Sequence, residues 1–430
     1  MVCQTDTDIL IIGAGASGLA AACAAASAGA SVVTADGNEQ PGKKLSATGN
    51  GRCNLSNTYC APQKYNQEAV AFVGRVLRRF DHKGTLRFFR ENGLLIREEQ
   101  EGRCYPYSGQ ASAVTDLLIR RAEALGVRFR LKDPVSECSV EEGVFFIRFS
   151  SGELLTARSL IIAAGGRAGL HFGSTGDGYG FARSFGHTLH APRPALVACE
   201  SDDPALAGLK GRARAQVTLL EDGQEKYAEY GEVQFTGTGL SGICVMNLTR
   251  FMEAARPAPK KKKRPVPGKD SELPAQKNHE YIIRIDFIPE YGKKEIIAML
   301  KNSLETVPLE KALSWLVNNR IASAVSGRSD GSAEKAAELL KCFDVKISRT
   351  KGWNDAQVTR GGIRLEEIDP DTLASRLVPG LFFCGEVTDV DGPCGGYNLQ
   401  WAWSSGCLGG VSAAEYAVNA QNKSDPAPAR

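Results

Sequence analysis

The chain has 430 residues, a formal net charge of +3, and 43% hydrophobic and 23% charged residues. This length predicts two or three domains, and the nearly neutral charge argues against a dedicated nucleic-acid binder or a membrane-surface protein. The twelve cysteines form no C-x-x-C pair and the five histidines do not cluster beside them, so no iron–sulfur, zinc or other metal site is predicted.

The first eight residues are polar and include two acids, which is not typical of a secretory signal peptide. No apolar run reaches the length of a membrane span. Many cysteines without pairing motifs are typical of the reducing cytoplasm. We therefore expect a cytoplasmic protein that acts on a small molecule and has no membrane or nucleic-acid partner.

A dinucleotide-binding turn is the strongest signal near the start of the chain. Residues 9–12 are apolar and mostly β-branched, and Gly13-x-Gly15-x-x-Gly18 opens an Ala-rich stretch directly behind them. The first glycine permits the tight turn, the second admits a pyrophosphate, and the third lets helix and strand pack closely. A second apolar run ends in Asp36, where a carboxylate can bind both hydroxyls of a ribose. The alternative is a glycine turn with a surface aspartate.

The chain then alternates between polar loops and regular elements. Residues 48–57 are rich in glycine, amides and hydroxyls, which suits the lining of a polar ligand better than a core; a plain surface loop is the alternative. Residues 66–92 predict two amphipathic helices. A period of two over 127–156 predicts short antiparallel strands, and 159–162 predict a separate buried strand that leads to Gly165, where the backbone would approach a ligand closely.

The predicted secondary structure changes twice in the middle of the chain, first to strands and then to helices. Residues 191–290 are β-rich, with an Asp-Gly hairpin signal at 222–223. Within them, 257–278 combine prolines with the basic run Lys260–Arg264, which favours a flexible, solvated loop over a nucleic-acid contact. Residues 291–349 predict a small helical insert.

A third ligand-binding edge is predicted near the end. A buried apolar run ends in Gly385 and Glu386, and a glycine-rich segment leads into a helix expected over 401–417, whose N-terminus could bind a pyrophosphate or a flavin oxygen. In an open parallel sheet the ligand lies beyond the carboxyl ends of the strands. Because strands end near 13, 165 and 385, we expect one crevice, and an elongated FAD suits it better than a nicotinamide cofactor alone.

These signals predict an α/β protein with a discontinuous Rossmann-like FAD-binding domain, an inserted β-rich domain and a small helical subdomain. The expected boundaries are 1–190 and 350–420 for the FAD-binding domain, 191–290 for the β-rich domain, 291–349 for the helical insert and 421–430 for a disordered tail.

The strings Thr-Gly-Asn-Gly-Arg-Cys-Asn, from residue 48, and Gly-Gly-Tyr-Asn-Leu-Gln-Trp-Ala-Trp, from residue 395, are highly specific. With them the chain resembles, over almost its whole length, the HI0933-like (BaiN-type) family of FAD-dependent oxidoreductases, also described as aminoacetone-oxidase-like flavoproteins. The resemblance implies cofactor contacts at Gly15, Ser17, Asp36, Lys44, Asn50, Gly51, Arg52, Cys53, Val135, Glu386, Asn398 and Leu399. The chain departs from the family at 257–278, which look like an insertion, and at 167–172, which replace a Ser/Pro-containing turn.

We accordingly expect two-electron, hydride-type chemistry on a small organic molecule, and the resemblance suggests a conjugated enone of the bile-acid type. The other glycine-rich turn with this spacing, at 237–242, lies in the β-rich region, so NAD(P)H is expected only as a transient electron donor. Tyr397 and Cys53 are candidate proton donors, with packing of the tyrosine and lining of the cofactor by the cysteine as the alternatives. Two other functions stay open: a flavoprotein acting on RNA, suggested by Lys260–Arg264, and a non-catalytic redox sensor.

Overall fold

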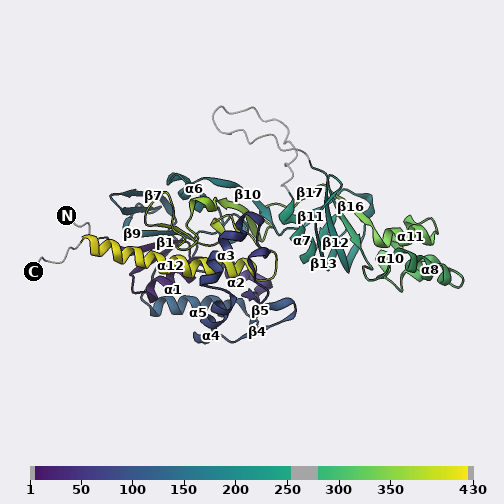
Figure 1. Cartoon of the computed structure of the whole chain (residues 1–430), viewed down its shortest axis with the longest axis horizontal. Helices are drawn as coiled ribbons and strands as arrows, with labels where there is room; N and C mark the ends of the chain where they lie inside the picture. Colours follow the sequence, from purple (N-terminus) through teal and green to yellow (C-terminus); the bar gives the residue numbers. More distant parts are fainter. Residues whose placement is uncertain (1–4, 253–278, 425–430) are drawn as a thin grey trace, which may run out of the picture. The chain divides into compact units, whose positions relative to one another are not determined.

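The computed structural model describes residues 5–252 and 279–424. The basic segment expected at 257–278 and the end of the expected tail, 425–430, lie outside the described residues. The chain divides into two compact units: unit 1 contains the residues up to Pro194 and those from Gln357 onward, and unit 2 contains Ala195–Ala356 (Figure 1). Each unit is described by itself below.

Unit 1 is built on a mixed sheet whose central strands run parallel (Figure 1). In the order β6-β2-β1-β9-β8-β7, with β19 also paired to β9, its strands are β6 (Arg128–Leu131), β2 (Val32–Asp36), β1 (Thr7–Ile12), β9 (Leu154–Ile162), β8 (Val144–Phe149), β7 (Val135–Glu141) and β19 (Leu381–Phe383). The β-branched residues of β1 are buried on both faces, as expected for a central parallel strand.

The register brings the carboxyl ends of four parallel strands to one edge. Ile12 lies opposite both Ala35 and Ile162, and Ile162 lies opposite Phe383. The turns that follow β1, β2, β9 and β19 therefore share one edge of the sheet, which is where parallel α/β sheets bind ligands.

Strand β9 differs from the prediction of two separate strands. Its first half, from Leu154, pairs antiparallel with β8, and its second half, to Ile162, pairs parallel with β19. The two halves form one strand because the extended backbone continues without a break through Ala157, which is fully buried.

Helices cover this sheet, and two of them pack unusually closely. Helix α1 (Ala16–Ser27) and helix α12 (Tyr397–Ser424) run side by side, because Gly406 and Gly410 leave room for the backbone of Ser17 and Ala21; a Cβ on either glycine would lie 2.4 Å from a carbonyl oxygen of α1. The other helices of unit 1 are α2 (Lys43–Gly51), α3 (Val70–Arg79), α4 (His82–Glu91), α5 (Ala111–Ala124) and α6 (Asp177–Ser184). The two helices predicted within 66–92 are confirmed as α3 and α4.

The predicted start of the last helix was wrong. Helix α12 begins at Tyr397 instead of 401, because Gly395 and Gly396 adopt positive φ angles (127° and 98°) that end the preceding loop. Residues 43–51 form α2, although the backbone departs from helical geometry at Thr48 and is left-handed at Gly49 and Asn50.

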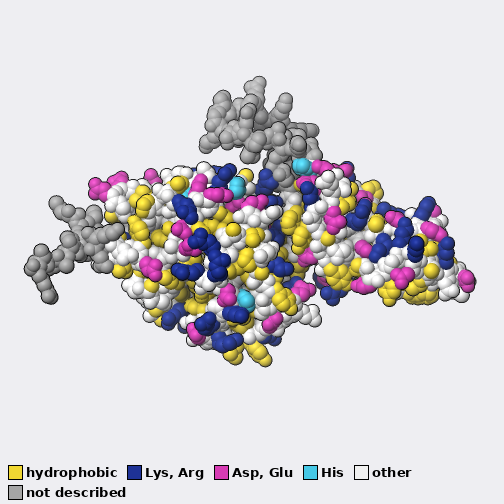
Figure 2. Space-filling view, in the orientation of Figure 1, with side chains coloured by type: hydrophobic (Ala, Val, Ile, Leu, Met, Phe, Trp, Pro, Cys, Tyr) yellow, Lys and Arg dark blue, Asp and Glu magenta, His cyan; other side chains and the backbone are white. Residues whose placement is uncertain are grey.

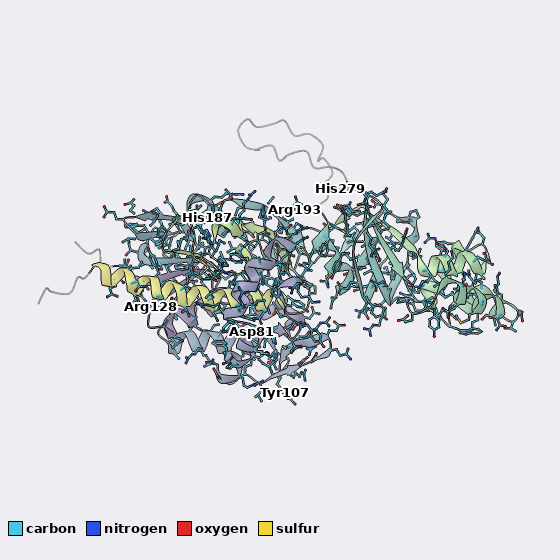
Figure 3. All side chains as sticks on the ribbon, viewed as in Figure 1. Asp81, Tyr107, Arg128, His187, Arg193 and His279 are labelled. Carbon is cyan, nitrogen blue, oxygen red and sulfur yellow. The ribbon has the colours of Figure 1, made fainter. Side chains whose placement is uncertain are left out.

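Short strands complete unit 1. Strands β3 (Ser56–Asn57), β5 (Arg103–Pro106) and β4 (Ile96–Glu98) form a small antiparallel sheet. Strands β10 (Leu189–Ala195) and β18 (Val358–Ile363) pair with each other. Asp81 caps α4 by accepting a hydrogen bond from the backbone N–H of Gly84 (Figure 3).

Unit 2 combines an antiparallel sheet with five described helices, four of which follow the strand β15. The sheet order is β16-β15-β12-β13-β14-β11-β17, with β16 (Phe343–Ile347), β15 (Tyr281–Asp286), β12 (Lys210–Glu221), β13 (Gln224–Thr236), β14 (Gly239–Ser241), β11 (Cys199–Glu200) and β17 (Arg349–Thr350). The helices are α7 (Ile243–Leu248), α8 (Lys293–Leu304), α9 (Leu309–Leu313), α10 (Asn319–Arg328) and α11 (Ala333–Lys341), of which α8 to α11 lie between β15 and β16. Strand side chains such as Val217 and helix side chains such as Leu300 share one apolar core.

The predicted α/β fold class, with a parallel Rossmann-type sheet and a separate antiparallel sheet, is confirmed. None of the described helices combines the length and apolar character that crossing a bilayer requires.

Candidate functional site

The glycine turn after β1 has the geometry that its spacing predicts. Gly13 adopts a φ of +103°, and a Cβ there would lie 2.5 Å from the carbonyl oxygen of Ala163. A Cβ on Gly18 would lie 1.8 Å from the carbonyl oxygen of Gly13, so this glycine lets α1 pack against the turn. At Gly15, by contrast, a Cβ would meet no described atom within 4 Å. The turn is therefore tight at two glycines and open at the third.

The N-terminus of α1 is available to an anion. Gly15 is its N-cap, no described side chain caps it, and its first turn contains no acid. The first N–H groups of a helix lack partners within the helix and carry the positive end of its dipole. An open glycine at an uncapped helix start is the arrangement that binds pyrophosphate in dinucleotide sites, so the donor set fits the expected cofactor.

Asp36 is tied into the turn. Its Oδ2 accepts a hydrogen bond from the N–H of Ala14 at 2.8 Å, and its Oδ1 accepts from the backbone N–H and the side-chain amide of Asn38 at 2.8 and 3.0 Å. A carboxylate offers about four acceptor positions. Three are occupied, which leaves room for one ribose hydroxyl instead of the two that we expected.

Val135 is the first residue of β7, and its neighbour Pro134 lies close to Gly37, the residue after Asp36. A Cβ on Gly37 would lie 3.3 Å from the side chain of Pro134, so the loop before β7 touches the residue that follows Asp36. Pro134 and Val135 also line a pocket of about 800 Å³ together with α6 residues. This position fits the expected contact of Val135 with the adenosine end of a dinucleotide.

Lys44 and Glu386 meet at the centre of the edge. Lys44 Nζ lies 2.9 Å from Glu386 Oε2, and both side chains are half-buried. Glu386 Oε1 accepts a hydrogen bond from the N–H of Thr359 at 2.7 Å. Thr359 in turn accepts hydrogen bonds through Oγ1 from the N–H groups of Arg167 and Ala168 at 2.8 and 3.1 Å, directly after Gly166. This network joins α2, the end of β9, β18 and the turn after β19.

The glycines at the ends of β9 and β19 differ in their surroundings. Gly165 has a φ of +72° and a Cβ there would meet no described atom within 4 Å, so its backbone is open. Gly385 has a φ of +78°, and a Cβ there would lie 2.4 Å from Ser17 Oγ. The hydroxyl of Ser17 thus faces the turn after β19, which links α1 to the Gly-Glu segment.

The start of α12 is a second helix N-terminus at this edge, with the backbone N–H groups of Asn398 and Leu399 in its first turn. The first backbone bond into this helix runs from Gln400 N to Gly396 O, at 2.9 Å, and its first turn has no acid. The Asn398 side chain is bound to the preceding loop: Oδ1 accepts from Gly392 N and Nδ2 donates to Gly392 O, both at 2.8 Å. Asn398 and Leu399 can therefore reach a cofactor through their backbones at the helix N-terminus, and this is the role that the geometry favours.

The two helix N-termini are staggered. Gly406 packs on Ser17 and Gly410 on Ala21, so α1 and α12 run in the same direction. Nine residues separate Gly406 from the start of α12 at Tyr397, which at 1.5 Å per residue places that start about 13 Å beyond the N-terminal turn of α1. An elongated ligand fits such a staggered pair of anion-binding ends.

The polar segment 48–57 packs against the loop that precedes α12. Asn57 Nδ2 donates to Gly395 O at 2.9 Å, and a Cβ on Gly396 would lie 2.4 Å from Ser56 O. Asn50 and Gly51 are exposed with left-handed backbones. The Arg52 guanidinium is engaged elsewhere, 2.5 Å from Glu99 Oε1 and stacked 4.2 Å over the Tyr105 ring, so it would have to leave these partners to contact a cofactor.

The two candidate proton donors are both buried. Cys53 is fully buried beside Leu45, Phe89 and Trp403, and burial raises the pKa of its thiol to about 12. The Tyr397 ring is 7% exposed and packs near Gly392 and Gly395. The geometry thus favours the packing alternative for Tyr397 and disfavours proton donation by Cys53.

Sequence reasoning missed several residues of this edge. Thr359 binds Glu386, and the buried Tyr179 interacts with both of these residues. Burial, together with the carboxylate of Glu386, raises the pKa of Tyr179. Ser405 and Trp401 hold Gly385 in place through its N–H and its carbonyl oxygen, at 2.9 and 3.2 Å. Trp401 and Ser405 lie within the helix predicted over 401–417, which was the available signal for them.

Comparisons with known proteins agree with this geometry. Residues 7–412 match the HI0933-like protein Rossmann domain. A 3-dehydro-bile acid delta(4,6)-reductase of Clostridium scindens is 35% identical over 423 residues, which cover 94% of this chain and 98% of that protein. A ribosomal RNA dihydrouridine synthase of Escherichia coli is 29% identical over 409 residues, covering 93% and 96%, and one of Haemophilus influenzae is 28% identical over 403 residues, covering 92% and 96%.

Among solved structures, a 3-ketosteroid-delta4-(5alpha)-dehydrogenase of Rhodococcus jostii RHA1 aligns with a TM-score of 0.52 at 16% identity, covering 96% of this chain and 98% of that one. At this identity the likeness concerns the fold alone.

Proposed function

The chain belongs to the HI0933-like family of flavin-dependent oxidoreductases, and from this premise we propose that it reduces a carbon–carbon double bond conjugated to a carbonyl group. The observation that carries the proposal is the 35% identity, along nearly the whole of both chains, to a reductase whose named substrate is a 3-dehydro bile acid. The proposed substrate is a small enone of that steroid type, and the proposed electron donor is NAD(P)H.

FAD is the cofactor that the crevice fits. At its adenosine end we propose that Gly15 and the first N–H groups of α1 bind the pyrophosphate, that Asp36 binds one ribose hydroxyl, and that Val135 contacts the adenine side. Gly13 and Gly18 shape the turn, and Ser17 supports it against Gly385.

At the other end, we propose that the backbone N–H groups of Asn398 and Leu399 face the flavin and favour negative charge on it. We propose that the Lys44–Glu386 pair and the open backbone at Gly165 contact the cofactor between these two ends. The remaining proposed contacts are Asn50, Gly51, Arg52 and Cys53. Bound flavin supplies two-electron hydride chemistry, and the protein supplies binding, orientation and charge.

The overall reaction has a simple balance. NAD(P)H gives up one hydride, and the double bond gains that hydride on its β carbon and one proton on its α carbon. NAD(P)H is proposed to bind only transiently, because the second G-x-G-x-x-G string, at 237–242, spans the antiparallel strand β14 and does not follow a parallel strand.

Anaerobic mixing tests this function. Purified protein with bound flavin is mixed with NADH or NADPH, and then with a 3-keto-4-ene steroid, while the visible flavin absorbance is followed. We expect the flavin to bleach with one nicotinamide and to recover with the enone, and mass spectrometry should show a steroid that has gained two hydrogens. A flavin that neither nicotinamide reduces would favour the non-catalytic redox-sensor alternative.

A second candidate substrate is uridine in ribosomal RNA. It is favoured by two relatives named ribosomal RNA dihydrouridine synthases, at 29% and 28% identity over more than nine-tenths of this chain. The uracil ring contains a double bond conjugated to a carbonyl, so forming dihydrouridine is the same chemical change on a different carrier. The test is to incubate the protein and NADPH with unmodified ribosomal RNA and to measure dihydrouridine in the digested nucleosides.

A further inference from the structure

We propose that unit 2 binds RNA through the exposed face of the first half of β12, an inference that rests on the second candidate function. The surface, called the β12 face here, consists of Lys210, Arg212 and Arg214 with Tyr230 of the neighbouring strand β13 (strands labelled in Figure 1). The proposed occupant is a single-stranded or looped segment of RNA.

Strand periodicity places the three cations on one side of the sheet. Lys210, Arg212 and Arg214 are all exposed, whereas the alternate residue Ala215 is fully buried toward the apolar core. Alternate residues of an antiparallel strand lie about 6.8 Å apart. The three positive charges therefore form an evenly spaced row, which suits the regularly repeated phosphates of a nucleic-acid strand.

The row of three cations is only partly neutralised, because Glu232 is the one acidic neighbour among its described ion pairs and cross-strand partners. Arg212 Nη1 lies 3.3 Å from Glu232 Oε1, and both side chains are more than half exposed, so this ion pair is weak. Among the described residues, no carboxylate forms an ion pair with Lys210 or Arg214. The residues opposite Lys210 and Arg212 on β13 are Thr236 and Gln234, which carry no charge, and the residue opposite Arg214 is Glu232.

The helical part of the same unit has a different surface. Basic and acidic side chains are interspersed there (Figure 2), and its lysines are paired: Lys293 with Glu338, Lys301 with Glu334, and Lys335 with Asp330. These lysines are as exposed as the β12 cations but carry compensating charges, so they provide a matched control.

An aromatic ring beside the row favours RNA over other polyanions. Tyr230 is 47% exposed, and the Arg214 guanidinium lies 5.8 Å from its ring centroid. Proteins that bind single-stranded nucleic acids combine a basic track with aromatic rings on which bases stack. A membrane surface or an acidic protein would use the charges but gain nothing from a stacking ring at this position.

The test is fluorescence anisotropy of the full chain, with flavin bound, against a labelled single-stranded RNA over a range of KCl concentrations. The variant Lys210→Gln/Arg212→Gln/Arg214→Gln should bind at least roughly tenfold more weakly, and the slope of log K against log [KCl] should decrease by about 2, because three phosphate contacts are lost. Tyr230→Ala should weaken binding about fivefold or more without changing the slope.

The control variant Lys293→Gln/Lys301→Gln/Lys335→Gln removes the same charge and should bind like the wild type. Deletion of 257–278 separates the β12 face from the Lys260–Arg264 run, and it should leave the effect of the triple β12 variant in place. The inference is overturned if the triple β12 variant binds RNA with the affinity and the salt slope of the wild type. It is also overturned if anionic phospholipid vesicles displace the labelled RNA as well as unlabelled RNA does.

The assay also separates this inference from the function on which it rests. If the wild-type protein forms dihydrouridine but the triple β12 variant binds RNA normally, the proposed RNA-binding role of the β12 face is refuted. The proposed dihydrouridine synthase activity then still stands. Protein that binds RNA through the β12 face but forms no dihydrouridine would refute the function and retain the surface.

Discussion

Lys44 and Glu386 are 342 residues apart in the sequence, yet Lys44 Nζ lies 2.9 Å from Glu386 Oε2. Lys44 lies at the start of α2, which follows β2, and Glu386 follows the strand β19. The pair therefore ties the two sequence-distant parts of unit 1 together at the edge where we propose that FAD binds.

A double-mutant cycle should measure this link. Lys44→Met and Glu386→Gln should each lower the free energy of unfolding, and their coupling should be about 0.5–1 kcal/mol, because both side chains are partly exposed and solvent screens the pair. Urea unfolding of the apoprotein and of the flavin-bound protein provides the values.

The pair Lys341–Asp286 in unit 2, 2.6 Å apart and similarly exposed, is the control for the flavin effect. Added FAD should change the coupling at Lys44–Glu386 but not at Lys341–Asp286. Equal responses of the two pairs would argue against a cofactor contact at Lys44.

Alanine substitution at two glycines of the first turn should have different effects, one on flavin content and the other on stability. Gly15→Ala should leave the apoprotein stable, since its Cβ meets no described atom within 4 Å, but it should reduce bound flavin because the methyl group occupies the space of the pyrophosphate. Gly18→Ala should destabilise the apoprotein by roughly 2–3 kcal/mol, since its Cβ would lie 1.8 Å from Gly13 O.

Flavin absorbance per protein and thermal unfolding of the apoprotein distinguish the two effects. Gly327→Ala in α10 of unit 2, which also meets no described atom within 4 Å, is the control and should keep its flavin. Full flavin content in Gly15→Ala would place the pyrophosphate elsewhere.

The stability of unit 1 should fall as the solution is made mildly acidic. His187 is buried, with Nδ1 3.0 Å from Glu367 Oε2 and Nε2 2.8 Å from Ser375 Oγ (Figure 3). Burial lowers the pKa of His187 below its usual 6.5, although Glu367 opposes this. Between the folded pKa and 6.5 the unfolded chain binds more protons, so the stabilisation is complete above pH 6.5 and is lost as the pH falls.

Glu367 stays ionised through this window. Burial raises its pKa, but hydrogen bonds from Thr188 and His187 outweigh burial and hold the pKa below 4.5. The change between about pH 7.5 and 5.5 in the free energy of unfolding should therefore be smaller in His187→Gln than in the wild type. Identical pH profiles of the two proteins would rule out His187 as the source.

Cys53 should resist alkylation in the folded protein. The thiolate is the reactive form, and burial raises the pKa of Cys53 to about 12, so almost none is ionised at about pH 8. Cys342 is partly exposed and should be modified by iodoacetamide first. Peptide mass spectrometry gives the order of modification, and early labelling of Cys53 would show that its pocket opens and would revive it as a candidate proton donor.

Local patterns in the chain were sufficient for the central part of the fold. The apolar run of β1, the glycine spacing and Asp36 predicted a strand, a turn and a helix, and all three are present. Such patterns succeed because strand burial, left-handed turns and helix starts depend on residues that are close neighbours in the sequence. Three buried runs with glycines at their ends were also enough to predict one shared edge.

The roles of individual side chains at that edge depended on contacts that no local pattern contains. Thr359 was not predicted because its partners, Glu386 and the backbone after Gly166, come from other parts of the chain. Asn398 was predicted as a cofactor contact, yet its amide binds Gly392 and only its backbone faces the helix end. The register of the parallel sheet decides which distant groups meet, and this register is set by the packing of the whole unit.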